Sequence, residues 1–223
     1  YLAPDKRPAV TNPKGQSIDT TYCILDLETT GFSPVTEKIT EIGVIKYKEG
    51  KIIEEFSCFV NPEKPIPAKV VEVTNITDDM VKDAETIEQV FPKLMQFIEG
   101  SVLVAHNADF DMGFLKHNAK VLGYEFDFTY LDTLSLAKEL FPEYKSYKLG
   151  RIAKNLGIKV DVAHRALDDV RTTVQVFKVM IDMLKERGVE TLEDIDLKAT
   201  DEAAKKEEFK KLKTYHAIIL AKD

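Results

Sequence analysis

The chain has 223 residues, of which 44% are hydrophobic and 31% are charged, as expected for one soluble domain with a sizeable core. Its formal net charge of −7 argues against a protein that holds long nucleic acid on a broad basic face. An enzyme that binds a few nucleotides in a metal-loaded cleft remains compatible with that charge. No run of about 18 apolar residues and no signal-like N-terminus occurs, so neither membrane insertion nor secretion is indicated.

The two cysteines, Cys23 and Cys58, both lie in apolar, strand-like runs. We interpret them as small buried side chains in a reducing, cytoplasmic compartment, with a disulfide between them as the weaker alternative. The chain begins with Tyr1 rather than Met and ends in an apolar segment without an obvious partner. We expect it to be part of a longer protein, although processing or cloning would explain the missing Met equally well.

In chain order, residues 1–20 contain three prolines and show no periodicity, so they are predicted to be an extended linker. Short apolar runs then predict strands, the second and third of which form a hairpin around Glu49 and Gly50. The predicted strands cover residues 22–27, 39–47, 52–60, 101–105 and 128–131. Residues 215–220 also have strand character.

Helices are predicted where apolar residues recur at helical spacing before a glycine or proline. They cover residues 86–98, 110–122, 133–140, 149–156 and 166–187, and a short helix capped by Thr77 or Asp78 precedes them. Residues 191–213 are charge-rich and expected to be helical in part. Three antiparallel strands followed by alternating strands and helices predict an α/β fold with a mixed sheet.

The end of the first strand carries two carboxylates, Asp26 and Glu28. Residues two apart in a strand share a face, so both side chains are expected to project together. Two acids that point the same way repel each other unless a cation lies between them, and oxygen ligands suit a divalent cation. On this short pattern alone, a solvated polar strand end is the more common alternative.

Two further segments carry acids at the start of a predicted helix. The first contains Asp109 and Asp111 behind a buried strand, where the helix dipole favours a carboxylate, so a capping role is the alternative to a site. The second contains His164, Asp168 and Asp169 at the start of the longest helix. A helix turns about 100° per residue, so only one of the two aspartates is expected to face a site, and His164 joins it only from a loop.

Taken together, the motifs DLETTG at 26–31, HNADFD at 106–111 and HRALDD at 164–169 resemble those of the DEDDh family of 3′–5′ exonucleases. The resemblance covers about residues 22–187, and its strength lies in the order and setting of all three motifs. It implies an RNase H-like fold with a five-stranded mixed sheet flanked by helices, two divalent cations (Mg²⁺ or Mn²⁺) and hydrolysis of the 3′-terminal phosphodiester to nucleoside monophosphates.

Carried over residue by residue, the resemblance assigns the metal-binding acids to Asp26, Glu28, Asp111 and Asp169, and the general base to His164. A histidine with an ordinary pKa near 6.5 can accept a proton from water near neutral pH. Binding of the terminal nucleotide is expected from a wider set of residues: Glu28, Thr29, Thr30, Phe32, Thr74, Asn107 and Phe110. Within it, Phe32 is expected to stack on or wedge beside a base.

Many bacterial proofreading subunits have a His-Gly pair before Ile-Thr in the middle loop, where this chain has Thr74 and Asn75. The sequence looks closest to the exonuclease domain embedded in PolC-type DNA polymerase III α subunits. The resemblance therefore implies an exonuclease domain at 21–188, an N-terminal flank at 1–20 and a C-terminal flank at 189–223 that connects to a neighbouring domain. The implied partners are single-stranded or frayed DNA 3′ ends and replicative polymerase domains or subunits, with no membrane.

Two other functions compete with DNA proofreading. A 3′–5′ exoribonuclease would use the same five residues on a different sugar, and discrimination would depend on how the 2′-hydroxyl is accommodated. A non-catalytic module that only binds DNA ends is disfavoured because all four acids and His164 are present. A nucleotide-binding transferase is disfavoured because no GxxxxGK[ST] loop occurs.

Overall fold

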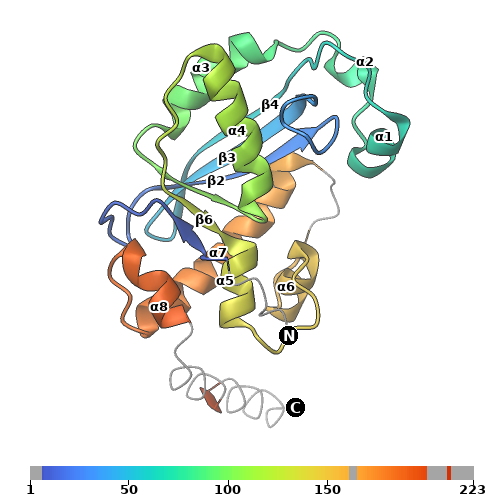
Figure 1. Ribbon diagram of the computed structural model, residues 1–223. Coiled ribbons are helices and arrows are strands. Elements are labelled where there is room, and N and C mark those ends of the chain that lie inside the picture. The colour runs from blue at the N-terminus through green and yellow to red at the C-terminus, as the bar shows by residue number, and fades with distance from the viewer. Residues whose placement is uncertain (1–6, 161–164, 200–209, 212–223) are drawn as a thin grey trace, which may run out of the picture.

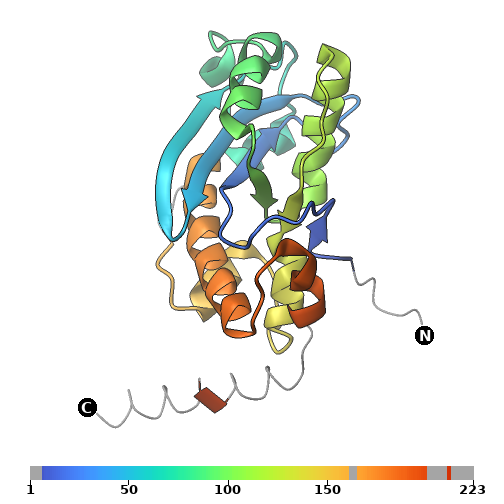
Figure 2. The same ribbon diagram turned by 90° about the vertical axis from the view of Figure 1, so that its left-hand side faces the viewer.

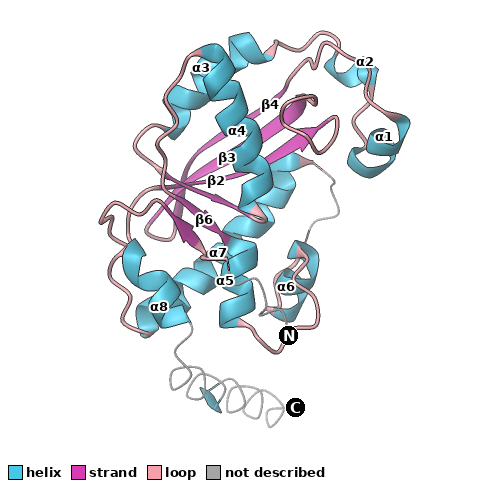
Figure 3. Ribbon diagram, in the orientation of Figure 1, coloured by secondary structure: helices cyan, strands magenta, loops and turns pink. Residues whose placement is uncertain are grey.

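The computed structural model describes residues 7–160, 165–199 and 210–211. In these parts of the chain, six strands form one sheet in the order β1-β6-β5-β2-β3-β4 (Figures 1 and 3). The strands are β1 (Val10–Thr11), β2 (Tyr22–Thr29), β3 (Ile39–Lys48), β4 (Lys51–Phe59), β5 (Val102–Ala105) and β6 (Tyr130–Asp132). Strands β2, β5 and β6 are parallel, whereas β3, β4 and β1 join antiparallel to their neighbours, so the sheet is mixed as predicted.

The helices cover both faces of this sheet. They are α1 (Ala68–Thr74), α2 (Asp78–Val81), α3 (Ile87–Ile98), α4 (Ala108–Leu122), α5 (Thr133–Leu140), α6 (Leu149–Asn155), α7 (Ala166–Glu186) and α8 (Ile195–Ala199), with the 3₁₀ helix η1 (Leu192–Asp194) before the last. Helices α3 and α4 pack on one face and α5, α6, α7 and α8 on the other, and Figures 1 and 2 show α4 and α7 on opposite sides of the sheet. No described helix is long and apolar enough to cross a bilayer.

Alternation along β2 decides which face receives the acids. Cys23 and Leu25 pack with α3 and α4, whereas Tyr22 and Ile24 pack with α7. Because side chains alternate along a strand, Asp26 continues the row that faces α7, and so does Glu28. The core on either side of β2 therefore fixes the register that points both carboxylates toward α7.

The sheet has one strand more than predicted, because Val10–Thr11 pairs with β6. This antiparallel pairing places part of a segment that was expected to be a linker at the edge of the sheet. The backbone N–H of Ile18 also donates to the carbonyl of Glu190 at 2.9 Å, and Leu192 and Ile195 are buried in the same core as α7. Residues 9–18 and 189–199 thus pack onto the sheet and α7. The division into an exonuclease domain at 21–188 and flanks at 1–20 and 189–223 stays a prediction.

Residues 62–80 form two short helices rather than a loop with one. Helix α1 was missed, since Thr74 is its one buried residue and its valines lack the spacing of a strong apolar face. It ends at Asn75, whose left-handed backbone (φ 57°) lets its N–H donate to the carbonyl of Val71. Thr77 caps α2, as the sequence indicated. The predicted strand at 215–220 lies outside the described residues.

Candidate active site

The acids of β2 and α7 meet at one point. Asp26, Glu28 and Asp169 each offer a carboxylate oxygen, and these oxygens lie within 4.8 Å of one another. Asp26 and Glu28 come from the carboxyl end of β2, and Asp169 from the first turn of α7, which packs against the same face. One strand and one helix are therefore enough to bring these three carboxylates together.

Asp111 approaches from the opposite face of the sheet. Pairing of β5 with β2 ends at Ile24 and Val104, so the next part of β2 extends beyond its neighbour. There the backbone N–H of Leu27 donates to Oδ1 of Asp111 at 3.0 Å, and the Asp111 side chain is buried. The first turn of α4 thus lies alongside the part of β2 that β5 leaves unpaired, and it places the Asp111 carboxylate beside Asp26 and Glu28.

The carboxylates of this cluster are buried and close together, so their ionised forms are unfavourable without a cation. Burial, followed by the charges of Asp111, Glu28 and Asp169, raises the pKa of Asp26 well above its ordinary value. Burial is also the main cause that raises the pKa of Asp111, while the Leu27 N–H lowers it. The pKa of Glu28 rises to about 7, first through burial and then through Asp169 and Glu41.

This donor set fits a divalent cation. Carboxylate oxygens are the ligands that Mg²⁺ and Mn²⁺ prefer, and a cation would remove the repulsion that raises these pKa values. Asp26, Glu28 and Asp169 offer oxygens at mutual distances suited to a shared ion, with Asp111 next to them. The residues present therefore fit the metal that the sequence motifs imply.

The structure separates the aspartates that the sequence left open. Asp109 is exposed and pairs with Arg7 at 3.1 Å, whereas Asp111 is buried in the cluster. Asp168 pairs with Arg171 at 3.1 Å on the outer side of α7, whereas Asp169 faces the cluster. His164 lies outside the described residues.

The residues expected to bind a nucleotide fall into two groups. The hydroxyl groups of Thr29, Thr30 and Thr74 are buried and donate to Gly31 O, Glu37 Oε2 and Val70 O, so each is used inside its own loop or helix. The other group is accessible. Phe32 is 90% exposed, and its ring meets the edge of Phe110 with 6.4 Å between centroids. Asn107 is exposed at the start of α4.

Three residues that were not among the predicted site residues hold α7 against the cluster: Glu41, Arg165 and Gly43. Glu41, opposite Glu28 in the sheet, is 3% exposed and accepts from Arg165 Nε at 3.1 Å and from the backbone N–H of Ala166 at 3.4 Å. The guanidinium of Arg165 in turn lies over the ring of Phe59, 4.3 Å from its centroid. An acid in an otherwise apolar strand was the signal for Glu41, because a buried charge needs a partner.

Gly43 is the third of these residues. It pairs with Asp26 in the sheet, and a Cβ on it would lie 2.8 Å from the backbone nitrogen of Leu167 and 2.9 Å from the carbonyl carbon of Ala166. Only a residue without a side chain lets the first turn of α7 approach β3 this closely. No sequence pattern predicted this contact, because it depends on the pairing of elements far apart in the chain.

Removal of the Glu41 carboxylate should lower kcat, although Glu41 has no direct part in substrate binding. We expect Glu41→Ala to lower kcat by about 10²-fold with KM changed by less than about threefold, since a misplacement of about 1 Å has such an effect. Glu41→Gln should recover part of kcat, because its amide oxygen still accepts from Ala166 N–H. The matched control is Glu55→Ala, which removes the β4–α7 ion pair between Glu55 and Arg171. Equal losses in the two alanine variants would contradict a positioning role for Glu41.

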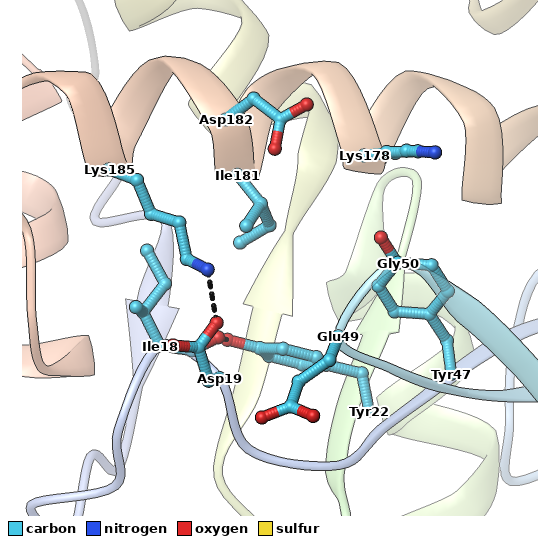
Figure 4. Close-up of a pocket in the computed structure, with 10 residues that line it drawn as sticks. All are labelled: Ile18, Asp19, Tyr22, Tyr47, Glu49, Gly50, Lys178, Ile181, Asp182 and Lys185. Carbon is cyan, nitrogen blue, oxygen red and sulfur yellow. Dashed lines mark hydrogen bonds and ion pairs between the residues drawn. The ribbon is translucent and has the colours of Figure 1, made fainter.

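The pocket drawn in Figure 4 lies elsewhere. It has a volume of about 170 Å³ between the start of β2, the β3–β4 turn and the second half of α7. Lys185 and Asp19 form an ion pair across it, and Tyr22 contributes one wall. Tyr22 and Asp26 are four residues apart on β2, which is about 13 Å along a strand. This pocket is therefore separate from the carboxylate cluster.

Comparison with known proteins agrees with this geometry. Residues 23–177 match the family model described as "Exonuclease". The whole chain is 43% identical to part of the DNA polymerase III PolC-type of Clostridium perfringens and 40% identical to that of Caldanaerobacter subterraneus subsp. tengcongensis. It spans only 15% and 16% of the length of these relatives.

Solved structures show the same fold. Exonuclease X, in complex with 5′ overhanging duplex DNA, superposes with a TM-score of 0.63 at 29% identity over 80% of this chain and 99% of that chain. The nuclease domain of 3′hExo, a DEDDh family member bound to rAMP, gives 0.63 at 21% identity, over 75% of this chain and 92% of that one. The RNase H-like fold and the recognised family are confirmed. With its matched segment spanning β2 to α7 and all four carboxylates, this chain belongs to the exonuclease family.

Proposed function

We propose that this chain hydrolyses the 3′-terminal phosphodiester of DNA, releasing nucleoside monophosphates, as the proofreading domain of a PolC-type replicative polymerase in the cytoplasm. The observation that carries the proposal is the carboxylate cluster of Asp26, Glu28 and Asp169, with Asp111 bonded to the Leu27 N–H beside it. The similarity of the whole chain to PolC-type polymerases supports the replicative setting.

The four acids share one task in this proposal. Asp26, Glu28, Asp111 and Asp169 hold two divalent cations, Mg²⁺ or Mn²⁺, which when bound lower the pKa of an attacking water and stabilise the leaving 3′ oxygen. Asp111 keeps Oδ1 on the Leu27 N–H, so its orientation is fixed by β2 itself. Phe32 offers an accessible aromatic ring to the terminal base, and Phe110 lies against it from the first turn of α4, which begins after Asn107.

His164 is the proposed general base, on the strength of the sequence motif. It precedes Arg165, the residue that Glu41 ties to the sheet. His164→Ala should slow hydrolysis by about 10²–10⁴-fold and remove the acidic limb of the pH–rate profile. The matched control is His117→Ala, a partly exposed histidine on α4 that should leave both rate and profile unchanged. An unchanged profile in His164→Ala would show that another group takes the proton.

The function itself is tested with 5′-labelled single-stranded DNA and RNA of one sequence, incubated with Mg²⁺ or Mn²⁺, with EDTA as the control. A ladder that shortens from the 3′ end of DNA and disappears in EDTA supports the proposal. Faster shortening of RNA would move the substrate to RNA ends. No ladder on either strand, together with tight binding of DNA ends, would contradict hydrolysis and leave a binding module.

A further inference from the structure

An open groove lies outside the carboxylate cluster, between the loop that follows α5 and helix α6. It has a volume of about 670 Å³, within the range of about 300–1,000 Å³ that ligand sites occupy. Lys145, Lys148 and Arg151 line it, with Tyr144 and Glu143 on its wall. Nothing in the mechanism above uses these residues.

The charge of this groove is unusual for the chain. Its three cations are exposed, and none forms an ion pair with a side chain in the described parts of the structure. Lys148 is the N-cap of α6 and Arg151 lies in its first turn, so both cations belong to the N-terminal end of this helix. With Glu143 as the acid on its wall, the groove has a net charge of about +2 in a protein whose net charge is −7.

The groove is held rigidly to the segment that leads into the site. Nε2 of His106 is 2.8 Å from the carbonyl oxygen of Tyr147, and Nδ1 is 2.9 Å from Thr133 Oγ1. His106 is followed by α4, which carries Asp111 in its first turn, and α6 packs against α7, which carries Asp169. Figure 1 shows α6 on the same side of the molecule as the N-terminal end of α7.

An ordered aromatic ring accompanies the cations. Tyr144 stacks on Phe141 with 4.8 Å between ring centroids and 10° between the ring planes. Sites for single-stranded nucleic acid combine cations that follow the backbone with aromatic rings that receive bases. An acidic protein surface would need the cations but not the ring, so the combination favours a nucleic acid strand.

We propose that this groove binds the phosphates of the single strand upstream of the 3′-terminal nucleotide, with Lys145, Lys148 and Arg151 as the contacts. The proposal rests on the proposed function, because the strand it holds is the one whose 3′ end lies at the carboxylate cluster. Binding in the groove would make the enzyme prefer longer strands, a preference that the carboxylate cluster alone does not explain.

The test compares two variants that each remove three positive charges. Lys145→Gln/Lys148→Gln/Arg151→Gln changes the groove, whereas Lys48→Gln/Lys51→Gln/Lys120→Gln changes three exposed lysines elsewhere. Two substrates are used: a single-stranded DNA 12-mer and the p-nitrophenyl ester of thymidine 5′-monophosphate, which has no upstream strand. Binding of a fluorescent 12-mer in Ca²⁺ is measured at several salt concentrations.

The groove variant should raise KM and Kd for the 12-mer on the order of 10-fold, and reduce the slope of log Kd against log salt by about 2. Ester hydrolysis should change by less than about twofold, and the control variant should behave as wild type. Equal effects of both variants, or loss of ester hydrolysis in the groove variant, would overturn the proposal. If wild-type protein hydrolyses neither substrate, the proposed function fails, while the binding measurements still decide the groove.

Discussion

Asp26→Asn is expected to abolish hydrolysis of DNA ends, by at least about 10³-fold, while making the metal-free protein more stable. The side chain keeps its size, so packing around β2 is preserved. What it loses is a charge that burial, Asp111, Glu28 and Asp169 all disfavour. Each kcal/mol gained raises Tm by about 2–4 °C in a protein of this size, so a shift of this order in EDTA is the expected result.

The stability gain depends on pH in a defined direction. The folded-state pKa of Glu28 is raised from 4.5 to about 7, so the unfolded chain loses this proton before the folded chain does. The wild-type protein without metal should therefore lose stability as pH rises from about 4.5 to 7. The raised pKa of Asp26 acts in the same direction. Asp26→Asn should flatten this loss, and Mg²⁺ should restore wild-type stability at pH 8.

The matched control is Asp168→Asn, because Asp168 lies on the outer side of α7 in an ion pair with Arg171. It should keep most of the activity and leave the pH dependence of Tm unchanged. A loss in Asp168→Asn as large as that in Asp169→Asn would show that α7 presents the other aspartate. Full activity in Asp26→Asn would remove the carboxylate cluster from the chemistry altogether.

Gly43→Ala should lower both stability and activity, although Gly43 carries no functional group. The added Cβ would meet the backbone of Ala166 and Leu167 at 2.8–2.9 Å, and backbone cannot give way as a side chain end can. The first turn of α7 must then move, and with it Asp169. We expect about 1–3 kcal/mol of destabilisation and a fall in kcat of about 10²-fold, measured by urea unfolding and by hydrolysis of labelled DNA.

Gly150→Ala is the control for this substitution. Gly150 lies in α6, and a Cβ there would have no atom within 4 Å. Alanine is more favourable than glycine within a helix, so the free energy of unfolding should rise by about 0.5–1 kcal/mol, with activity retained. A Gly43→Ala protein with wild-type kcat would mean that α7 tolerates displacement, and that the close approach to β3 does not position Asp169.

Much of the site was open to prediction because its signals are local. An apolar run ending in Asp26 and Glu28 predicts a strand with two acids on one face, and the structure has that arrangement. Asp111 and Asp169 lie in the first turns of their helices, as the sequence indicated. The hairpin predicted around Glu49 and Gly50 is present, and both turn residues have positive φ.

The remainder depends on contacts between distant segments. Val10–Thr11 becomes a strand only because β6 offers it an edge, so two residues in a proline-containing segment gave no signal. Glu41 and Gly43 acquire their roles from the register that sets them opposite Glu28 and Asp26 and from the approach of α7. Knowing that β2 and β3 pair does not reveal which residue of β3 meets a helix more than 120 positions later.

We propose that the carboxylates of β2, α4 and α7 form one divalent-metal site. Calorimetric titration of metal-free protein with Mn²⁺ tests it most directly, using wild type, Asp26→Asn, Asp169→Asn and the control Asp168→Asn. We expect wild type and Asp168→Asn to bind Mn²⁺, and the affinity of the two cluster variants to fall by at least about 10-fold, on the order of the loss when residues that support a metal site are removed. Equal Mn²⁺ affinity in all four proteins would contradict it.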